Sequence, residues 1–426
     1  MRFGIFYEFQ LPKPWGERDE YNLFKEGLAQ IELADKLGYD YAWEVEHHFL
    51  DEYSHGSAPE VFLAHAAART KNIRLGHGIR QVIPHYNHPA RTAEGIATLD
   101  LLSDGRVDFG IGEGATRLEL GGFGIPAKRK RALSLESAEQ IANMMVMTPY
   151  PGFEGEGFQM PCRNVLPKPL QKPHPPMWMA CTNRDTIKVA AQKGLGVLGF
   201  SFLDPDEAKQ WADIYYGIIK SDECVPLGHS VNANIAMVSG FSIHHDEAEA
   251  IRRGQEGFEF FAYALQTLVA KDNVPGRTDI WGEFQAKRGD RNDKLIRAAI
   301  DGNRNLTRTP GIGTPDQMRK HLKEFQEVGV DQVVFMQQCG RNKHEDICAS
   351  LQMFADEVMG DFKAEVEERE AKKAKELAPY IEAALARKPK MRELADDEIP
   401  VVRASVDTAL VNQSTKLVEE SAAGDD

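Results

Sequence analysis

Two adjacent histidines that follow a short apolar run are the residues best suited to acid–base chemistry in this sequence. The run from Asp40 to Glu46 has the composition of a buried strand, and His47 and His48 stand where it opens into a loop. Histidine is the side chain whose unperturbed pKa places its charge change between pH 5 and 8. Neighbouring side chains of an extended chain point in opposite directions, so this pair cannot easily share a metal ion. We therefore expect catalytic roles for His47 and His48 and no metal site.

Glycines interrupt the ends of two further apolar runs. A glycine weakens a buried strand unless the chain bulges there or something lies close against its backbone. The second run matches the loose G-x-G-x-x-A form of a dinucleotide-binding loop, but the stretch 118–126 does not have the pattern of the helix that such a loop requires. We interpret the glycine-containing ends of both runs as backbone surfaces on which a planar ligand binds. The candidate contacts are Gly76, His77, Gly78, Gly112 and Glu113.

A phosphate site is predicted after the fifth apolar run. Thr182 and Asp185 fit the pattern [ST]-x-x-[DE] of a helix start. The first turn of a helix exposes N–H groups that favour a phosphate, and the hydroxyl of Thr182 and the charge of Arg184 would add to this preference. Capping alone remains an alternative. We expect Cys181 to be a small residue that lines this site. A role as nucleophile is not expected, because the sequence identifies no base partner for its thiol. The candidates are Cys181, Thr182, Asn183 and Arg184.

The elements that would position these residues alternate regularly along the chain. Short apolar runs, each followed by a segment of helical period, favour a closed parallel (β/α)8 TIM barrel over an open doubly wound sheet. In such a barrel the active-site residues lie at the carboxyl ends of the strands, which is where the candidates above stand. The eight strands are expected at 2–6, 40–46, 73–82, 107–111, 177–180, 196–202, 232–241 and 331–337.

Two insertions and a tail break the alternation. Residues 150–176 are rich in proline and glycine and are expected to contain a hairpin at 153–158. Residues 271–310 are polar, and with Trp281 and Phe284 they are a candidate for a segment that closes over the site. We expect the barrel to span 1–360 and the residues 361–426 to form a charged, partly helical and partly disordered tail. Such a tail would be solvated or would wrap a partner.

Composition narrows the class of protein further. The formal net charge of −14 argues against nucleic acid or an anionic membrane surface as a general partner, since both require a basic face. The five cysteines are too few for a disulfide scaffold and form no CxxC pair. We find no signal peptide and no long uncharged apolar run, so we expect a cytoplasmic protein.

At this point the sequence resembles the bacterial luciferase-like flavin monooxygenases. The resemblance covers residues 1 to about 362, and the Gly-His-Gly strand end and the long tail are most similar to the members that oxidise terpenes and hydrocarbons. The segments that carry it are Arg2-Phe3-Gly4, Gly38 to Trp43, Glu46-His47-His48-Phe49, Leu75 to Gly78, Asn87-His88-Pro89, Thr98 to Arg106, Phe109 to Gly112, Gly313-Thr314-Pro315 and Gly329-Val330-Asp331.

The resemblance implies a dimeric barrel that binds reduced FMN at the carboxyl ends of its strands. The reduced FMN would come from a separate NAD(P)H-dependent flavin reductase and would react with O2 to a C4a-peroxyflavin, which oxygenates a small, hydrophobic organic substrate. His47 corresponds to the catalytic histidine of the family, and His48 to a neighbour that matters for flavin handling. A non-proline cis peptide bond under the flavin corresponds to residues 76–78, and the phosphate-binding turn to Cys181 and Thr182.

Three positions depart from luciferase. The chain has one residue more between Gly76 and Pro84, so the cis bond cannot be assigned to one pair. Luciferase has Cys-Arg at the positions of Gly112 and Glu113, which puts a basic phosphate contact there in doubt. It has Glu-Ser at the positions of Cys181 and Thr182, so light emission from aldehydes is not implied.

Two alternatives stay open. The same barrel could bind the deazaflavin F420 and transfer a hydride without O2, although the long acidic tail of F420 would prefer more basic residues at the mouth. The chain could also be a non-catalytic flavin-binding subunit, against which the presence of His47 argues. Anaerobic titration with both cofactors distinguishes the first alternative, and a His47→Ala variant the second.

Overall fold

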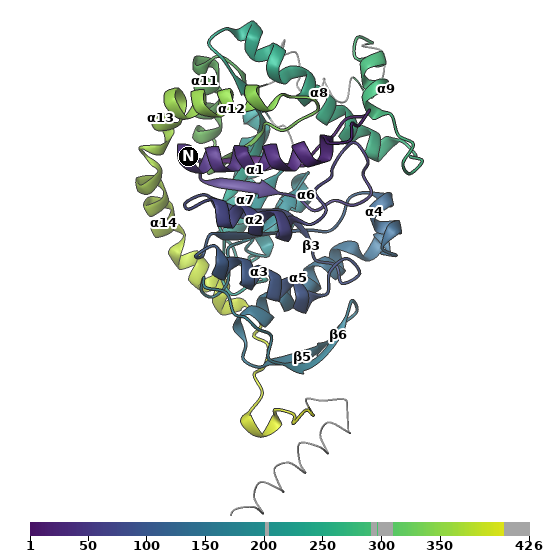
Figure 1. Ribbon diagram of the computed structural model, residues 1–426. Helices are drawn as coiled ribbons and strands as arrows, with labels where there is room; N and C mark the ends of the chain where they lie inside the picture. Colours follow the sequence, from purple (N-terminus) through teal and green to yellow (C-terminus); the bar gives the residue numbers. More distant parts are fainter. Residues whose placement is uncertain (201–203, 291–295, 297–309, 404–426) are drawn as a thin grey trace, which may run out of the picture.

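Eight parallel strands form a closed barrel at the centre of the molecule (Figure 1). The computed structural model describes residues 1–200, 204–290, 296 and 310–403. The barrel confirms the predicted (β/α)8 fold, and its order around the axis is β1-β12-β9-β8-β7-β4-β3-β2, so β7 lies opposite β1. The bounds are β1 (Arg2–Tyr7), β2 (Tyr41–Glu44), β3 (Arg74–Gln81), β4 (Val107–Gly112), β7 (Met177–Cys181), β8 (Gly196–Gly199), β9 (Ile235–Gly240) and β12 (Gln332–Met336).

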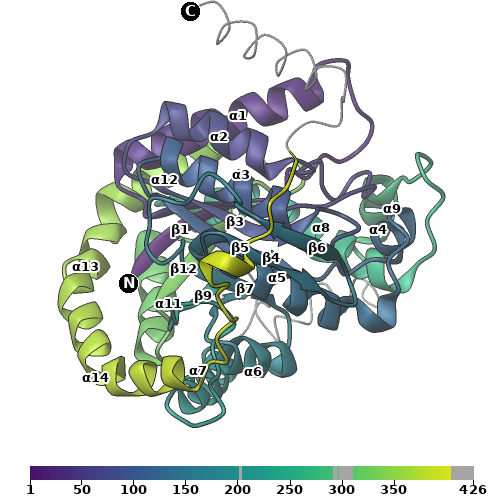
Figure 2. The same cartoon turned by 90° about the horizontal axis from the view of Figure 1, so that it is seen from below.

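Helices surround the barrel (Figure 2). The predicted capping box is confirmed at one of them, where Thr314 accepts from the N–H of Gln317 and the Gln317 side chain accepts from the N–H of Thr314. In the described part of the chain, no helix has the length and apolar character needed to cross a membrane. The outer helices are α1 (Asp19–Leu37), α2 (Pro59–Arg69), α3 (Pro89–Leu102), α5 (Lys130–Val146), α6 (Arg184–Gln192), α7 (Pro205–Ile219), α11 (Pro315–Glu327) and α12 (His344–Phe354).

The first insertion is the predicted hairpin. Its strands β5 (Tyr150–Glu154) and β6 (Gln159–Arg163) pair in antiparallel fashion and project from one side of the barrel (Figure 1). Because the hairpin is separate from the barrel sheet, it leaves the alternation of strand and helix intact.

In the described residues, two helices follow β9 beside the barrel mouth, and the second of them lies in the insertion at 271–310. After β9 and the short strand β10 (Ser242–Ile243), the chain forms α8 (Glu247–Ala270) and α9 (Ile280–Lys287) and returns through β11 (Ile312–Gly313) to α11. The candidate closing segment was placed at 271–310. Of this range, residues 291–295 and 297–309 lie outside the described residues.

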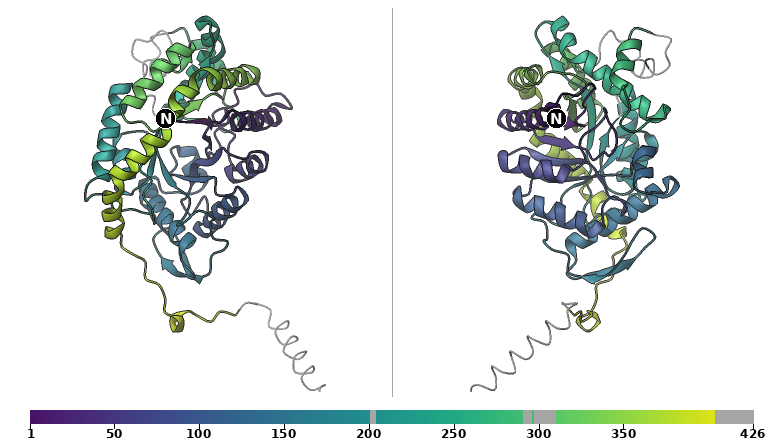
Figure 3. Two further views of the ribbon diagram at one scale, coloured as in Figure 1. Left: turned by 90° about the vertical axis from the view of Figure 1, so that its left-hand side faces the viewer. Right: turned by 45° about the vertical axis from the view of Figure 1, so that its right-hand side comes forward.

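The C-terminal segment, which we had expected at 361–426 as a charged, partly helical tail that is solvated or wraps a partner, packs on the barrel through its helix, and residues 404–426 lie outside the described residues. After α13 (Gly360–Lys363), helix α14 (Val366–Arg387) runs past the amino-terminal ends of the strands (Figure 3). Glu370 pairs with Arg2, and Lys373 binds Asp331 at 2.6 Å. Leu377 is only 2% exposed, so burial of an apolar side chain adds to these ion pairs.

Candidate active site

A cavity opens at the carboxyl ends of the barrel strands and has one acid–base wall, one basic wall and one apolar wall. It holds about 1170 Å³ of empty space, its open mouth included. Glu8 follows β1, and His47 and Tyr53 follow β2, whereas Thr182 follows β7 on the opposite side of the barrel and Lys130 begins α5. The cavity therefore lies where a (β/α)8 barrel places its active site.

His47 lies between two carboxyl groups at the cavity wall. Its Nδ1 is 2.9 Å from Oε1 of Glu119, and its Nε2 is 3.5 Å from Oε2 of Glu8. The backbone N–H of His47 donates to the carbonyl of Gly56 at 2.8 Å, which fixes the loop. Burial by itself would lower the pKa of His47, but Glu119 and Glu8 raise it, and the net result is a pKa of about 9. His47 is therefore a cation at neutral pH.

Glu8 directly follows β1 and is almost fully buried. Its Oε1 accepts a hydrogen bond from the hydroxyl of Tyr53 at 3.2 Å. Burial raises the pKa of Glu8 to about 7, and the nearby His47 opposes that rise. Glu8 was not among the residues singled out in the sequence, because a lone glutamate after an apolar strand carries no motif.

Glu119 is the second carboxylate that the sequence analysis missed. It lies on α4 (Arg117–Gly122), a short helix in the stretch that we had expected not to be helical. Burial would raise the pKa of Glu119, but His47 and the hydroxyl of Thr116 lower it. The available signal was the capping pattern itself, since Thr116 stands three residues before Glu119 and accepts from its N–H at 3.1 Å.

Phe49 and Gly122 bring α4 against the histidine loop. Phe49 has a φ of 65°, in the left-handed region that a side chain rarely adopts. This turn places its ring so close to Gly122 that a Cβ added there would lie 2.5 Å from the ring. The absent side chain at Gly122 thus permits the approach that puts Glu119 beside His47.

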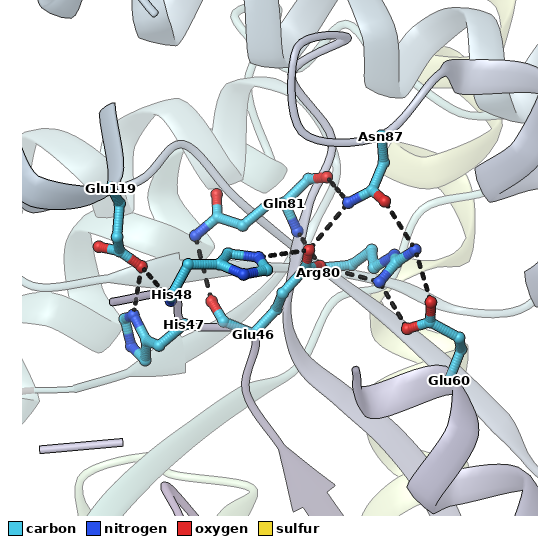
Figure 4. A network of polar contacts seen from close by, with 8 residues as sticks. All are labelled: Glu46, His47, His48, Glu60, Arg80, Gln81, Asn87 and Glu119. Carbon is cyan, nitrogen blue, oxygen red and sulfur yellow. Dashed lines mark hydrogen bonds and ion pairs between the residues drawn. The ribbon is translucent and has the colours of Figure 1, made fainter. Parts of the chain in front are cut away.

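His48 points away from His47 and into a separate polar network (Figure 4). Its Nε2 is 3.1 Å from Oε1 of Glu46, which also accepts from Asn87 at 2.9 Å. The other carboxylate oxygen of Glu46 accepts from Arg80 at 3.0 Å and from the N–H of Gln81 at 2.9 Å. The backbone N–H of His48 donates to Glu119 at 3.2 Å, so His48 supports the position of Glu119 and does not itself line the cavity.

The glycines of β3 serve the packing of the barrel interior. A Cβ added at Gly76 would lie 2.0 Å from the ring of Trp43, so the space that we had assigned to a ligand is filled by a side chain. Gly78 faces the barrel interior beneath the cavity, also beside Trp43. His77 is fully buried next to Phe109 of the neighbouring strand, and this burial lowers its pKa to about 3. None of the three residues at 76–78 lines the cavity.

The expected cis peptide bond is absent from this segment. The bonds between Gly76 and Ile79 are trans, and the strand register shifts between His77 and Arg80. That shift is the bulge that the glycine pattern allowed as an alternative. In the described residues, the cis bonds precede Pro14, Pro149, Pro167 and Pro173.

Gly112 and Glu113 do line the cavity, beside two cations. Glu113 accepts from Arg131 at 3.0 Å and lies 3.6 Å from Nζ of Lys130. Lys130 also donates to the carbonyl of Gly114 at 2.5 Å and lines the cavity itself. Lys130 therefore supplies a positive charge on the side where Glu113 takes the place of a basic residue.

The turn after β7 contributes one residue to the cavity. Thr182 lines it, whereas the thiol of Cys181 is buried, donates to the carbonyl of Met179 and has its pKa raised to about 12 by burial. Helix α6 is capped by Asn183, which accepts from two N–H groups at 3.0 Å, and not by Thr182 as predicted. Arg184 lies outside the cavity and pairs with Glu207.

Apolar side chains form the wall toward α8. Phe261, Leu265 and Leu268 of this helix face the cavity together with Phe200 and Met336. Helix α9 packs on the same helix through Phe284 and Trp281, whose rings lie 5.6 Å and 4.9 Å from that of Phe260. The described part of the second insertion thus supports the apolar wall from behind.

The polar atoms of the cavity fit a flavin nucleotide. Oε1 of Gln81 and Oε2 of Glu8 are buried and accept no hydrogen bond in the described part of the chain, which leaves two acceptors for a ligand N–H or O–H. Lys130 and Thr182 offer a cation and a hydroxyl to a phosphate. The residues present therefore match a planar, hydrogen-bonding ring that carries a phosphate.

A (β/α)8 barrel with an acid–base cluster beside a cavity at the carboxyl ends of its strands is the arrangement of a barrel enzyme. The chain belongs to the luciferase-like monooxygenase family, whose model matches residues 1–332. It is an oxidoreductase of the flavin-dependent monooxygenase class.

Two curated relatives indicate the range of the family. The chain is 29% identical, over 46% of its length and 53% of the relative, to the oxygenase component of the flavin-dependent trigonelline monooxygenase of Acinetobacter baylyi. It is 23% identical, over 84% of its length and 97% of the relative, to the alkanal monooxygenase alpha chain of Photorhabdus laumondii.

Solved structures share the fold. The monooxygenase RslO1 of Streptomyces bottropensis is 25% identical and matches 85% of this chain and all of its own, with a TM-score of 0.67. The oxygenating constituent of 3,6-diketocamphane monooxygenase of Pseudomonas putida, in complex with FMN, is 18% identical and matches 84% of this chain and 98% of its own, with a TM-score of 0.64. A coenzyme F420-dependent tetrahydromethanopterin reductase of Methanopyrus kandleri is 22% identical and matches 85% of this chain and 99% of its own, with a TM-score of 0.58.

Proposed function

We propose that this protein is the oxygenase component of a two-component monooxygenase that accepts reduced FMN from an NAD(P)H-dependent flavin reductase. With O2, it would oxygenate a small hydrophobic substrate. The observation that carries the proposal is the cavity in which a His–Glu cluster, a lysine and an apolar wall face one another. The name of the trigonelline relative, an oxygenase component, supports the two-component arrangement.

Each wall of the cavity has a part in this function. Lys130 and Thr182 would hold the phosphate and Gln81 would accept from the ring, while Gly112 and Glu113 line the same cavity. Reduced FMN, when bound, supplies the electrons that activate O2. The apolar wall would hold the substrate and exclude water, and His47 would keep a positive charge and a proton at the cavity wall.

Cofactor choice is tested by anaerobic titration with reduced FMN and with reduced F420. We expect binding of FMN, followed by an absorbance change when O2 is added. Binding of F420 alone, without reaction with O2, would instead support the hydride-transfer alternative that the F420-dependent relative suggests.

The catalytic histidine is tested by a His47→Ala variant. We expect it to bind reduced FMN but to oxygenate substrate roughly 10²-fold more slowly, since the loss of a fixed charge or hydrogen-bond donor beside developing negative charge costs factors of this size. Substrates for the assay are an alkanal, 3,6-diketocamphane and trigonelline, as named for the relatives. His85→Ala, a change of an exposed loop histidine, is the matched control. An unchanged rate in His47→Ala would favour a non-catalytic flavin-binding subunit.

The proposal also includes a homodimer and a cytoplasmic location, as the family resemblance implies. Light scattering of the purified chain measures the first, and a monomer at assay concentration would contradict it.

A further inference from the structure

The two carboxyl groups on either side of His47 are held very differently. Glu119 is fully buried and accepts three hydrogen bonds: from the hydroxyl of Thr116 at 2.7 Å, from the N–H of His48 at 3.2 Å and from Nδ1 of His47 at 2.9 Å. Such a carboxylate stays ionised. Glu119 therefore fixes the proton on Nδ1 and holds the ring charged.

Glu8 has a much weaker set of partners. Tyr53 donates to its Oε1 at 3.2 Å, and its Oε2, 3.5 Å from Nε2 of His47, accepts no hydrogen bond in the described residues. A buried carboxylate with so few donors is costly, so the group keeps a proton readily. Glu8 is 3% exposed yet lines the cavity, which means that this proton is available to a ligand and shielded from bulk water.

We propose that Glu8 delivers to the cavity the one proton that the reduction of O2 consumes, with His47 as the fixed positive charge beside it. The proposal rests on the proposed function. It assigns the proton transfer to a residue for which the family resemblance implied no role.

The proton balance requires one such donor. Anionic reduced FMN, O2, the substrate and one proton give oxidised FMN, the oxygenated substrate and water. Without a substrate, the same proton ends in hydrogen peroxide. The O–H bond of Glu8 breaks and an O–H bond forms on the reduced oxygen, while the electrons come from FMN. Water at the cavity mouth then protonates Glu8 again.

The electrostatic surroundings support this division of roles. The titratable groups that face Glu8 are His47, Tyr53, Glu119 and Cys339. Burial raises the pKa of Glu8 to about 7, whereas the carboxylates around His47 hold its pKa at about 9. Near neutral pH, Glu8 can therefore both lose and regain a proton, and His47 cannot easily do so.

The first test measures the protonation of Glu8 directly. We expect infrared difference spectra of ¹³C-glutamate-labelled protein between pH 5.5 and 8.5 to show a protonated carboxyl band that titrates near pH 7. The band should vanish in Glu8→Gln, which keeps the shape of the side chain, and persist in Glu20→Gln. Glu20 is a matched control because it pairs with Nδ1 of His55 at the surface. Persistence of the band in Glu8→Gln would overturn the proposal.

The second test uses reduced FMN and O2 as the probe. At pH 6 we expect Glu8→Gln to bind reduced FMN as the native protein does but to reoxidise it roughly tenfold more slowly. The native rate should fall as the pH rises above 7, and the variant should lack this fall. Equal rates and pH profiles in a variant that binds reduced FMN would overturn the proposal alone. Absence of FMN binding in both proteins would instead overturn the proposed function, and the delivery step with it.

Discussion

His47 receives its charge from residues that are far apart in the sequence. Glu119 follows it by 72 positions, and Glu8, which precedes it, directly follows another strand, β1. The sequence could single out His47 from its type and its place at a strand end. It could not predict the pKa of about 9, because that value depends on two carboxyl groups that only the closed barrel brings to the ring.

The raised pKa of His47 has a consequence for stability. A histidine whose pKa is about 9 in the folded state and 6.5 in the unfolded state stabilises the fold fully below pH 6.5, and this contribution is lost as the pH rises through 9. We expect the melting temperature of Glu119→Gln to depend less on pH between 6.5 and 9 than that of the native protein. Thermal unfolding followed by circular dichroism at several pH values measures this.

Glu20→Gln serves as the control for the stability measurement as well. It removes a carboxylate from the exposed pair with His55, so its melting temperature should follow the native pH dependence. Equal slopes for native protein and Glu119→Gln would show that Glu119 does not set the charge of His47.

Helix α4 shows how an element without a clear pattern can position a site. It has only six residues, too few for a helical period to be recognised, and it is placed by the contact between Gly122 and Phe49. We expect Gly122→Val to push α4 away from the histidine loop and to reduce activity roughly tenfold or more, because small displacements of catalytic groups are costly. The rate of FMN reoxidation measures the effect.

The neighbouring glycine provides the comparison for Gly122→Val. A Cβ added at Gly121 meets nothing within 4 Å, so Gly121→Ala should fold and react as the native protein does. If both variants were equally active, the packing of Phe49 on Gly122 would not be what holds Glu119 in place.

The barrel strands could be predicted because each is a short apolar run before a helical period, and the structure confirms all eight. The role of Gly76 could not be predicted from the sequence. The space that a side chain at Gly76 would occupy is filled by the ring of Trp43, which lies on the neighbouring strand. The packing of α14 on the barrel could have been predicted from the spacing of its apolar residues. Leu377, Ile381 and Ala384 stand at helical spacing and form one apolar stripe.

At the scale of the whole molecule, α14 joins residues 366–387 to the amino-terminal ends of the barrel strands. We expect Leu377→Ala to lower the free energy of unfolding by about 2–4 kcal/mol, as for other buried leucines, while FMN binding is kept because the cavity lies at the other end of the barrel. Urea denaturation measures the loss. Tyr380→Ala, on the exposed side of the helix, should cost much less, and equal losses would contradict the burial of this stripe.

The loop that carries His47 is also joined to α9 by one buried carboxylate. Glu52 accepts from the N–H groups of Ile280 and Trp281 at 2.6 Å and 3.0 Å, and from that of Lys13 at 3.0 Å. These donors include the first turn of the helix that backs the apolar wall. An outward movement of α9 would leave the buried Glu52 side chain without the N–H groups of Ile280 and Trp281, unless the histidine loop moved with the helix. If a substrate enters by displacing α9, these hydrogen bonds couple its entry to the position of the histidine loop.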